Sequence, residues 1–189
     1  MIIPNKKSIF VHINKTAGSS VEHAFGVYPD DQHNTAKEYI KELSSRKWST
    51  HFTFSFVRNP FSRIVSAWKT PWVSKNEFDK FSKFVKDFCI KPSNYNFFRW
   101  SHVMSVFDPR MKLFNDQGDQ LVNFIGKMES YQSDFNTVCD EIGIPRQKLP
   151  HKNKSKHKHY SEYYNEETRE IVGKKYAKDI AHFGYKFEG

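Results

Sequence analysis

Short hydrophobic runs alternate with amphipathic segments along this chain. Residues 8–13 form an apolar, β-branched run that predicts a buried strand, and the run stops at a small, hydroxyl-rich turn over residues 14–20. Apolar residues resume at positions 21–25, where they predict the start of a helix. The first elements are therefore a strand, a tight turn and a helix.

The same order of strand, turn and helix returns in the middle of the chain. Residues 35–44 carry apolar side chains at helical spacing and predict an amphipathic helix. Residues 52–57 alternate aromatic and hydroxyl side chains, which predicts a strand that ends at Arg58-Asn59-Pro60. Pro60 suits the first position of a further helix.

The second half of the chain follows a similar pattern. Helical periodicity runs over residues 77–89, and residues 121–125 predict a short strand. Ser133-Asp134 predicts the N-cap of a helix that ends at Gly143. A single final helix is expected from about residue 165 to residue 182.

Strands that alternate with helices predict an α/β fold. We expect one domain over residues 1–189, with a three-layer, mostly parallel sheet covered by helices on both faces. In such sheets ligands bind at the carboxyl ends of the strands. The turns that follow residues 13 and 57 are therefore the places to look for a binding site.

Composition narrows the class of protein. The chain has 18 Phe, 9 Tyr and 4 Trp, so an aromatic, packed core is expected rather than a disordered chain. Its net charge of +9 indicates anionic partners without distinguishing nucleic acid, nucleotide, sulfated glycan or membrane surface. Cys89 and Cys139 lack the spacing of a zinc site or a disulfide framework.

No apolar run approaches the length of a membrane span, and the N-terminus lacks the layout of a signal peptide. The expectation is a soluble, cytoplasmic protein without a membrane span. The sequence leaves open whether an anchor was removed, and it leaves the oligomeric state open.

Residues 15–20, which we call the anion loop, combine the features of a phosphate or sulfate site. Lys15 adds a positive charge, Gly18 allows close backbone approach, and three hydroxyl side chains add donors. A nucleotide-triphosphate loop needs a glycine five residues before its Gly-Lys pair, but Lys15 precedes the first glycine of the chain. A Walker A loop is therefore excluded.

A second cation follows the next strand. Arg58 lies just before a predicted helix on which Ser62 and Ser66 share one face. Two cationic turns at the ends of two strands indicate a ligand with two separate anionic groups, as in a bisphosphorylated nucleotide.

These two segments resemble a known family. Residues 12–20 are similar to the 5′-phosphosulfate loop, and residues 56–66 to the 3′-phosphate segment, of sulfotransferases that use 3′-phosphoadenosine 5′-phosphosulfate (PAPS). The closest likeness is to the branch that includes carbohydrate sulfotransferases, and it continues over residues 33–36, 124–129 and 183–185. Asn14 replaces the usual proline and Ala17 a common glycine, but neither change removes a charge or a hydroxyl.

The resemblance implies a P-loop nucleotide-kinase-like fold and a function. The expected reaction moves a sulfuryl group from PAPS to a hydroxyl acceptor, with a carbohydrate as the expected acceptor, and leaves adenosine 3′,5′-bisphosphate (PAP). The scheme needs no metal. The implied cofactor-binding residues are Lys15, Thr16, Ala17, Gly18, Ser19, Ser20, Arg58 and Ser66. Lys154 and Ser155 would close over the nucleotide; they belong to the lysine- and histidine-rich residues 151–159, which we call the basic loop.

Two catalytic roles follow from the same resemblance. Lys15 would neutralise the charge that grows on the bridging oxygen as the sulfuryl group leaves. A histidine would take the proton of the acceptor hydroxyl. His33 is the first choice because it matches a family segment, with His51 second and His102 third.

Three other interpretations stay open at this point. A small kinase would need a Walker loop besides its candidate magnesium ligand, Asp108. A nucleic-acid or polyanion-binding protein would use the basic loop, although its known sequence signatures are absent and we expect no nucleic-acid partner. His157 and His159 could belong to a metal site, but no further ligand completes it.

Overall fold

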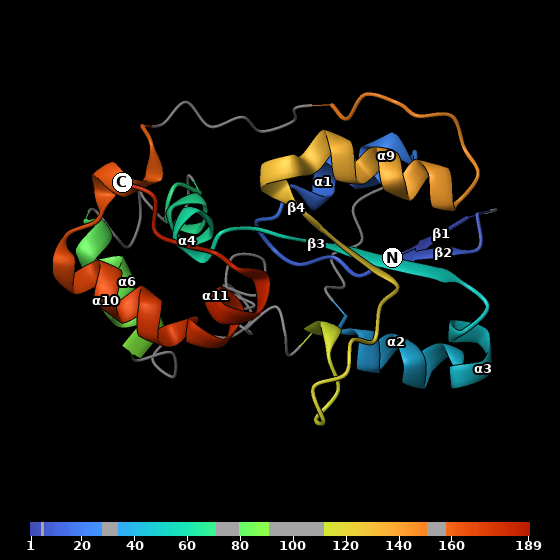
Figure 1. The fold of residues 1–189 in the computed structure, drawn as a ribbon, viewed down its shortest axis with the longest axis horizontal. Helices are drawn as coiled ribbons and strands as arrows, with labels where there is room; N and C mark the ends of the chain where they lie inside the picture. The colour runs from blue at the N-terminus through green and yellow to red at the C-terminus, as the bar shows by residue number, and fades with distance from the viewer. Residues whose placement is uncertain (5, 28–33, 71–79, 91–111, 151–157) are drawn as a thin grey trace. The chain divides into compact units, whose positions relative to one another are not determined.

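The computed structural model describes residues 1–4, 6–27, 34–70, 80–90, 112–150 and 158–189 (Figure 1). The chain divides into two compact units. The first comprises Met1–Val57 and Pro109–Asn153, and the second comprises Arg58–Asp108 and Lys154–Gly189. The expectation of one domain over residues 1–189 stays a prediction.

The first unit is built on a four-stranded sheet in the order β1-β2-β3-β4. The strands are β1 (Ile2–Ile3), β2 (Ser8–Phe10), β3 (Phe52–Val57) and β4 (Phe124–Lys127). The two pairs β2–β3 and β3–β4 are parallel, whereas β1 pairs with β2 antiparallel. The predicted α/β class and mostly parallel sheet are confirmed for the described residues.

The register brings the carboxyl ends of three strands to one edge. Phe54 of β3 pairs with Phe10 on one side and with Phe124 on the other. The backbone N–H of Val11 continues this pairing by donating to the Phe54 carbonyl at 2.8 Å. The anion loop therefore begins at the carboxyl edge of the sheet, which is where the sequence predicted it.

Helices flank the sheet on both sides in Figure 1, where α1 and α9 lie on one side and α2 and α3 on the other. Their bounds are α1 (Gly18–Ala24), α9 (Tyr131–Glu141), α2 (Ala36–Leu43) and α3 (Ser45–Trp48). The short helix η2 (Met128–Ser130) leads into α9. The α1/α9 side holds an aromatic core that includes Phe10, Val21, Phe54, Phe56 and Phe135.

Aromatic and hydroxyl side chains alternate along β3 and have different environments. Phe54 and Phe56 are fully buried in the aromatic core. The Ser55 hydroxyl between them donates to the carbonyl of Val11 at 2.6 Å, within the sheet. Ser55 thus satisfies a backbone carbonyl in the segment that leads into the anion loop instead of facing water.

The second unit is helical. It contains α4 (Pro60–Trp68), α6 (Phe81–Ile90), η3 (Tyr160–Tyr163), α10 (Glu166–Lys175) and α11 (Ala177–Phe183). The periodic apolar residues that predicted a helix over residues 77–89 lie in the core of this unit where the structure describes them. They are Phe81, Val85 and Phe88.

Two helix boundaries differ from the predictions. The single helix expected over residues 165–182 is wrong, because the chain breaks at the buried Tyr176 into α10 and α11. The helix predicted to be capped by Ser133-Asp134 begins earlier, at Tyr131. Asp134 has another role, because its Oδ2 accepts the Lys127 backbone N–H at 2.6 Å and the Ser130 hydroxyl at 2.7 Å.

Within the described part of the chain, the helices are too short or too polar to cross a bilayer.

Candidate functional site

The anion loop contains two residues in the left-handed region of backbone conformation. Lys15 has φ 66° and Ala17 has φ 61°, although neither is a glycine. Such conformations are disfavoured for residues with a Cβ and are found where surrounding structure imposes them, often at functional sites. Successive N–H groups in such a turn point to one side and form a concavity that binds anions.

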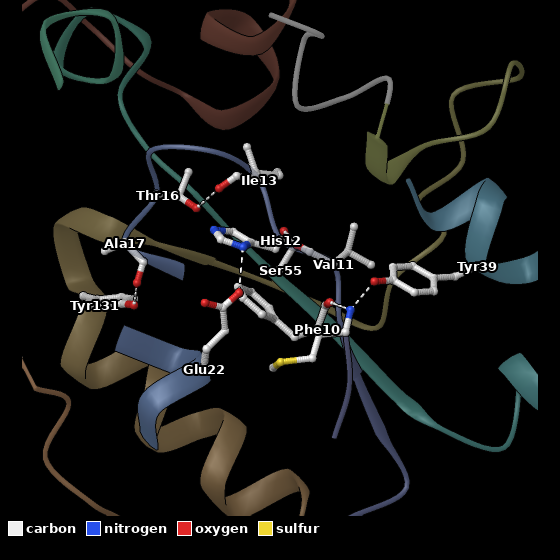
Figure 2. A network of polar contacts seen from close by, with 11 residues as sticks. Phe10, Val11, His12, Ile13, Thr16, Ala17, Glu22, Tyr39, Ser55 and Tyr131 are labelled. Atoms are coloured by element: carbon white, nitrogen blue, oxygen red, sulfur yellow. Dashed lines mark hydrogen bonds and ion pairs between the residues drawn. The ribbon is translucent and has the colours of Figure 1, made fainter. Parts of the chain in front are cut away.

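Thr16 closes the turn from within. Its side chain is fully buried, and its Oγ1 donates to the carbonyl of Ile13 at 2.7 Å (Figure 2). The sequence had suggested this hydroxyl as a donor to a ligand. In the structure this hydroxyl donates its proton within the loop. The group of Thr16 that could donate to a bound anion is therefore its backbone N–H.

Helix α1 starts at Ala17 without a side-chain cap. The Ala17 carbonyl accepts two hydrogen bonds, from the Ser20 backbone N–H at 2.9 Å and from the Tyr131 hydroxyl at 2.6 Å. Lys15 is half-buried and Ser19 is exposed, whereas Ser20 is buried. The half-buried Lys15 and the exposed Ser19 therefore lie beside a helix start without a side-chain cap.

A histidine and a glutamate lie directly against this loop. Nδ1 of His12 lies 2.9 Å from Oε1 of Glu22, and the Glu22 side chain is 2% exposed (Figure 2). The other carboxylate oxygen, Oε2, has no hydrogen-bond partner among the described residues. The buried carboxylate therefore faces the imidazole at ion-pair distance, next to the anion loop.

Gly18 is required by the position of this imidazole. A Cβ built on Gly18 would overlap Nε2 of His12. The ring is fixed from another side by Phe10, which stacks on it with centroids 5.4 Å apart. Nε2 of His12 therefore lies against the backbone of the anion loop.

Tyr131 joins α9 to the same loop. Burial raises the pKa of its phenol above the ordinary range, the Ser20 hydroxyl beside it opposes the rise, and the Glu22 carboxylate adds to it. The phenol consequently stays protonated and acts as a donor at neutral pH.

His12, Glu22 and Tyr131 were not assigned by the sequence analysis. His12 lay inside the quoted motif, three residues before Lys15, but a histidine in a strand gave no signal of its contact with Glu22. Tyr131 lies 114 residues beyond Ala17, and nothing in the local pattern connects them.

Residues 58–66, which we call the arginine segment, belong to the second unit and follow β3 directly in the chain. Nε of Arg58 donates to the Ser62 hydroxyl at 2.9 Å, one helical turn along α4. Ser66 lies a further turn along the same face and is half-buried. The conformation of Arg58 is thus set by a hydroxyl on the face that also carries Ser66.

Asn59, the next residue of this segment, is structural. Its side chain accepts the Phe61 backbone N–H at 3.1 Å and donates to the Lys186 carbonyl at 2.8 Å. It therefore caps α4 and ties the start of that helix to the C-terminal segment of the same unit.

The structure separates one candidate base from the loop. His51 precedes β3 at its amino end, with Nδ1 2.8 Å from the Lys47 carbonyl. The six residues of β3 span about 20 Å, and the anion loop lies at their other end. This position does not support a base role for His51. His33, His102, Lys154 and Ser155 lie outside the described residues.

The described residues contain no group of three histidine, cysteine or carboxylate side chains that could hold a metal ion. His159 contacts Ser161 instead, with Nδ1 2.8 Å from its Oγ, and His157 lies outside the described residues.

Comparison with known proteins gives one match. Neither the curated proteins nor the solved structures contain a significant relative of this chain. A profile of the sulfotransferase family matches residues 1–186, which is nearly the whole chain and includes both the anion loop and the arginine segment. The protein therefore belongs to the sulfotransferase family.

Proposed function

We propose that this sulfotransferase transfers a sulfuryl group from PAPS to a hydroxyl of a carbohydrate and releases PAP. We also infer that its sheet belongs to the P-loop nucleotide-kinase-like fold of such enzymes. The observation that carries the proposal is the conformation of the anion loop. In a chain of this family, Lys15 and Ala17 both have left-handed backbone conformations, and the helix that follows them begins without a side-chain cap.

The residues of the loop fit a phosphosulfate group. Ala17 has no side-chain oxygen that could cap α1, so no N-cap side chain competes with an anion for the N–H groups of Gly18 and Ser19, whereas the Ser20 N–H is bonded to the Ala17 carbonyl. Lys15 supplies the charge that a nucleotide phosphate needs, and the exposed Ser19 supplies a further donor. This set of groups suits an oxyanion and contains no ligand that would favour a divalent metal.

The roles of the chain's residues follow from the chemistry. PAPS supplies an activated sulfuryl group, which an acceptor hydroxyl attacks as the bond between sulfur and the 5′-phosphate oxygen breaks. Lys15 stabilises the negative charge that develops on that oxygen. Arg58, held by Ser62, and Ser66 are assigned to the 3′-phosphate, and Lys154 and Ser155 to closure over the nucleotide by family resemblance.

The general base has two candidates. His33 is proposed because it matches a family segment. His12 is supported by geometry, because its imidazole lies against Gly18 and its Nδ1 faces the buried Glu22. Either imidazole would take the proton of the acceptor hydroxyl as the new sulfur–oxygen bond forms.

Calorimetric titration with PAP tests the nucleotide site. The intact protein is expected to bind PAP, and Lys15→Ala and Arg58→Ala are each expected to weaken binding by about 10-fold to 100-fold, because each removes a charge-assisted contact. Lys6→Ala is the matched control, since this exposed lysine precedes β2 at the amino end of the strand, away from the loop. Absence of PAP binding by the intact protein would contradict the proposal.

Transfer of labelled sulfate to a panel of glycans tests the base and the acceptor class together. With His33 as the base, His33→Ala retains PAP binding and loses transfer, while His12→Ala retains turnover. Loss of turnover in His12→Ala alone would assign the base to His12. If only non-carbohydrate hydroxyls accepted sulfate, the carbohydrate part of the proposal would be wrong.

A further inference from the structure

We propose that Tyr131 is a positioning residue for the nucleotide, because its hydroxyl holds the anion loop in the conformation that presents its backbone to the 5′-phosphate. The inference rests on the proposed function. It concerns a residue on α9, far from the anion loop in sequence, that donates to the Ala17 carbonyl of the loop and lies beside the Ser20 hydroxyl.

The contact is made at a residue of the loop whose backbone conformation is unfavourable. Ala17 has φ 61° and ψ 26°, a conformation that its Cβ disfavours. Its carbonyl accepts the Tyr131 hydroxyl at 2.6 Å (Figure 2). The same carbonyl accepts the Ser20 N–H at 2.9 Å. Both lone pairs of this oxygen are therefore used, which fixes the plane of the peptide group between Ala17 and Gly18.

The side chain of Tyr131 is itself held firmly. Its ring meets the fully buried Phe56 edge to face, with centroids 4.9 Å apart and an interplanar angle of 84°. Asp134, one turn along α9, accepts the backbone N–H of Lys127 at the end of β4. The start of α9 is thus anchored to the sheet at two places, so the phenol is a fixed point against which the loop is placed.

The phenol stays a hydrogen-bond donor to the loop. Burial keeps it protonated, and Glu22 nearby reinforces that state. A protonated phenol has one proton to donate, and the Ala17 carbonyl receives it. Loss of the hydroxyl would leave the left-handed Ala17 held by the Ser20 N–H alone among the contacts described here.

The test compares two nucleotides on Tyr131→Phe, which keeps the aromatic contact with Phe56. The variant is expected to lose about fivefold in affinity for PAP, the effect of one neutral hydrogen bond. Its affinity for adenosine 3′-monophosphate, which lacks the 5′-phosphate, is expected to be unchanged. Tyr160→Phe is the matched control, because the Tyr160 hydroxyl also has a backbone partner, Glu188, but in the second unit.

Unchanged PAP affinity in Tyr131→Phe, or an equal loss for both nucleotides, would overturn the inference. A general structural role predicts the equal loss, since it would weaken both ligands alike. If the intact protein bound no PAP at all, the proposed function would fail first, so the two failures are distinguishable.

A double-mutant cycle adds a second readout. The loss caused by Tyr131→Phe is expected to shrink in a Lys15→Ala background and to persist in an Arg58→Ala background, because only Lys15 shares the anion loop. The opposite pattern would place Tyr131 outside the 5′ side of the site.

If Tyr131→Phe does not fold, 3-fluorotyrosine at position 131 replaces it. Its phenol is a stronger hydrogen-bond donor, so PAP affinity is expected to be at least equal to that of the intact protein. A loss of PAP affinity would overturn the inference.

Discussion

At the scale of single residues, the anion loop depends on a glycine for a reason other than backbone freedom. Gly18 lies in an ordinary helical start, but the space where its Cβ would stand is occupied by the ring of His12. That ring cannot retreat freely, because Phe10 stacks on it and Glu22 contacts its Nδ1. The identity of residue 18 is therefore set by a side chain six positions earlier.

Gly18→Ala is expected to lower the free energy of unfolding by about 1–3 kcal/mol, the usual cost of overpacking, and to weaken PAP binding as the loop shifts. Urea denaturation and calorimetry measure the two effects. In the control Gly173→Ala, a Cβ in the middle of α10 would meet only Phe61 Cζ at 3.9 Å. Because alanine favours helix, that variant should gain about 0.5–1 kcal/mol.

The double variant Gly18→Ala with His12→Ala separates overpacking from other causes. Removal of the ring should restore much of the stability lost in Gly18→Ala, since the two groups compete for one space. A Gly18→Ala variant as stable as the intact protein would contradict this account.

At the scale of elements, the helices owe their boundaries to caps that are visible in the sequence. Thr35 and Glu38 form a capping box at the start of α2, and Asn165 and Thr168 form another at the start of α10. The starts predicted near residues 35 and 165 agree closely with these caps. At α9 the signal misled, because Asp134 caps the end of β4 rather than the helix that contains it.

Asn59 is the cap with the largest expected effect on the arginine segment. Asn59→Ala removes both the acceptor for the Phe61 N–H and the donor to the Lys186 carbonyl. We expect the free energy of unfolding to fall by about 1–3 kcal/mol, as measured by urea denaturation. PAP affinity should fall with it, because α4 carries Ser62 and Ser66.

Asn59→Ser distinguishes the two hydrogen bonds of that side chain. A serine hydroxyl at the N-cap can still accept the Phe61 N–H but lacks the amide that donates to Lys186, so its loss of stability should be smaller than that of the alanine variant. Equal effects of the two substitutions would show that the cap contributes little.

At the scale of the whole molecule, each unit has a core of its own and one buried cysteine. Cys89 packs in the core of the second unit and Cys139 in that of the first. Burial raises the pKa of the Cys89 thiol from 9.0 to about 12, with Lys175 opposing the rise, and burial also raises the pKa of Cys139. Both thiols should therefore be inert toward alkylating reagents in the folded protein.

Thiol labelling across a urea series tests the prediction of a single cooperative domain. At pH 8 both cysteines are expected to become reactive at the same urea concentration, measured by mass spectrometry of the labelled peptides. Cys89→Ala and Cys139→Ala serve as single-site controls. Labelling of one cysteine well before the other would show that the two units unfold separately.

The same shift sets a direction for the pH dependence of stability. The pKa of Cys89 is higher in the folded protein than in the unfolded chain. Its neutral thiol therefore makes its full contribution to the free energy of unfolding below pH 9. That contribution declines as the pH rises from 9 toward about 12.

Features that depend on neighbouring residues could be predicted from the sequence. Alternation in residues 52–57, helical periodicity in residues 35–44 and Pro60 indicated the type and order of the elements, because hydrophobic period and proline act over a few positions. The small, cationic composition of residues 15–20 located the anion loop, and its motif indicated the sulfotransferase family that the profile match confirms.

The way in which that loop is held depends on the tertiary structure. The contact of His12 with Glu22 and the inward hydroxyl of Thr16 lie within one strand–turn–helix segment, whereas Ala17 is supported by Tyr131 of α9. A contact between groups 114 residues apart depends on how the strands pair and the helices pack, and no local pattern records it. The loop can therefore be found by its composition, but its shape is set by the side chains that surround it.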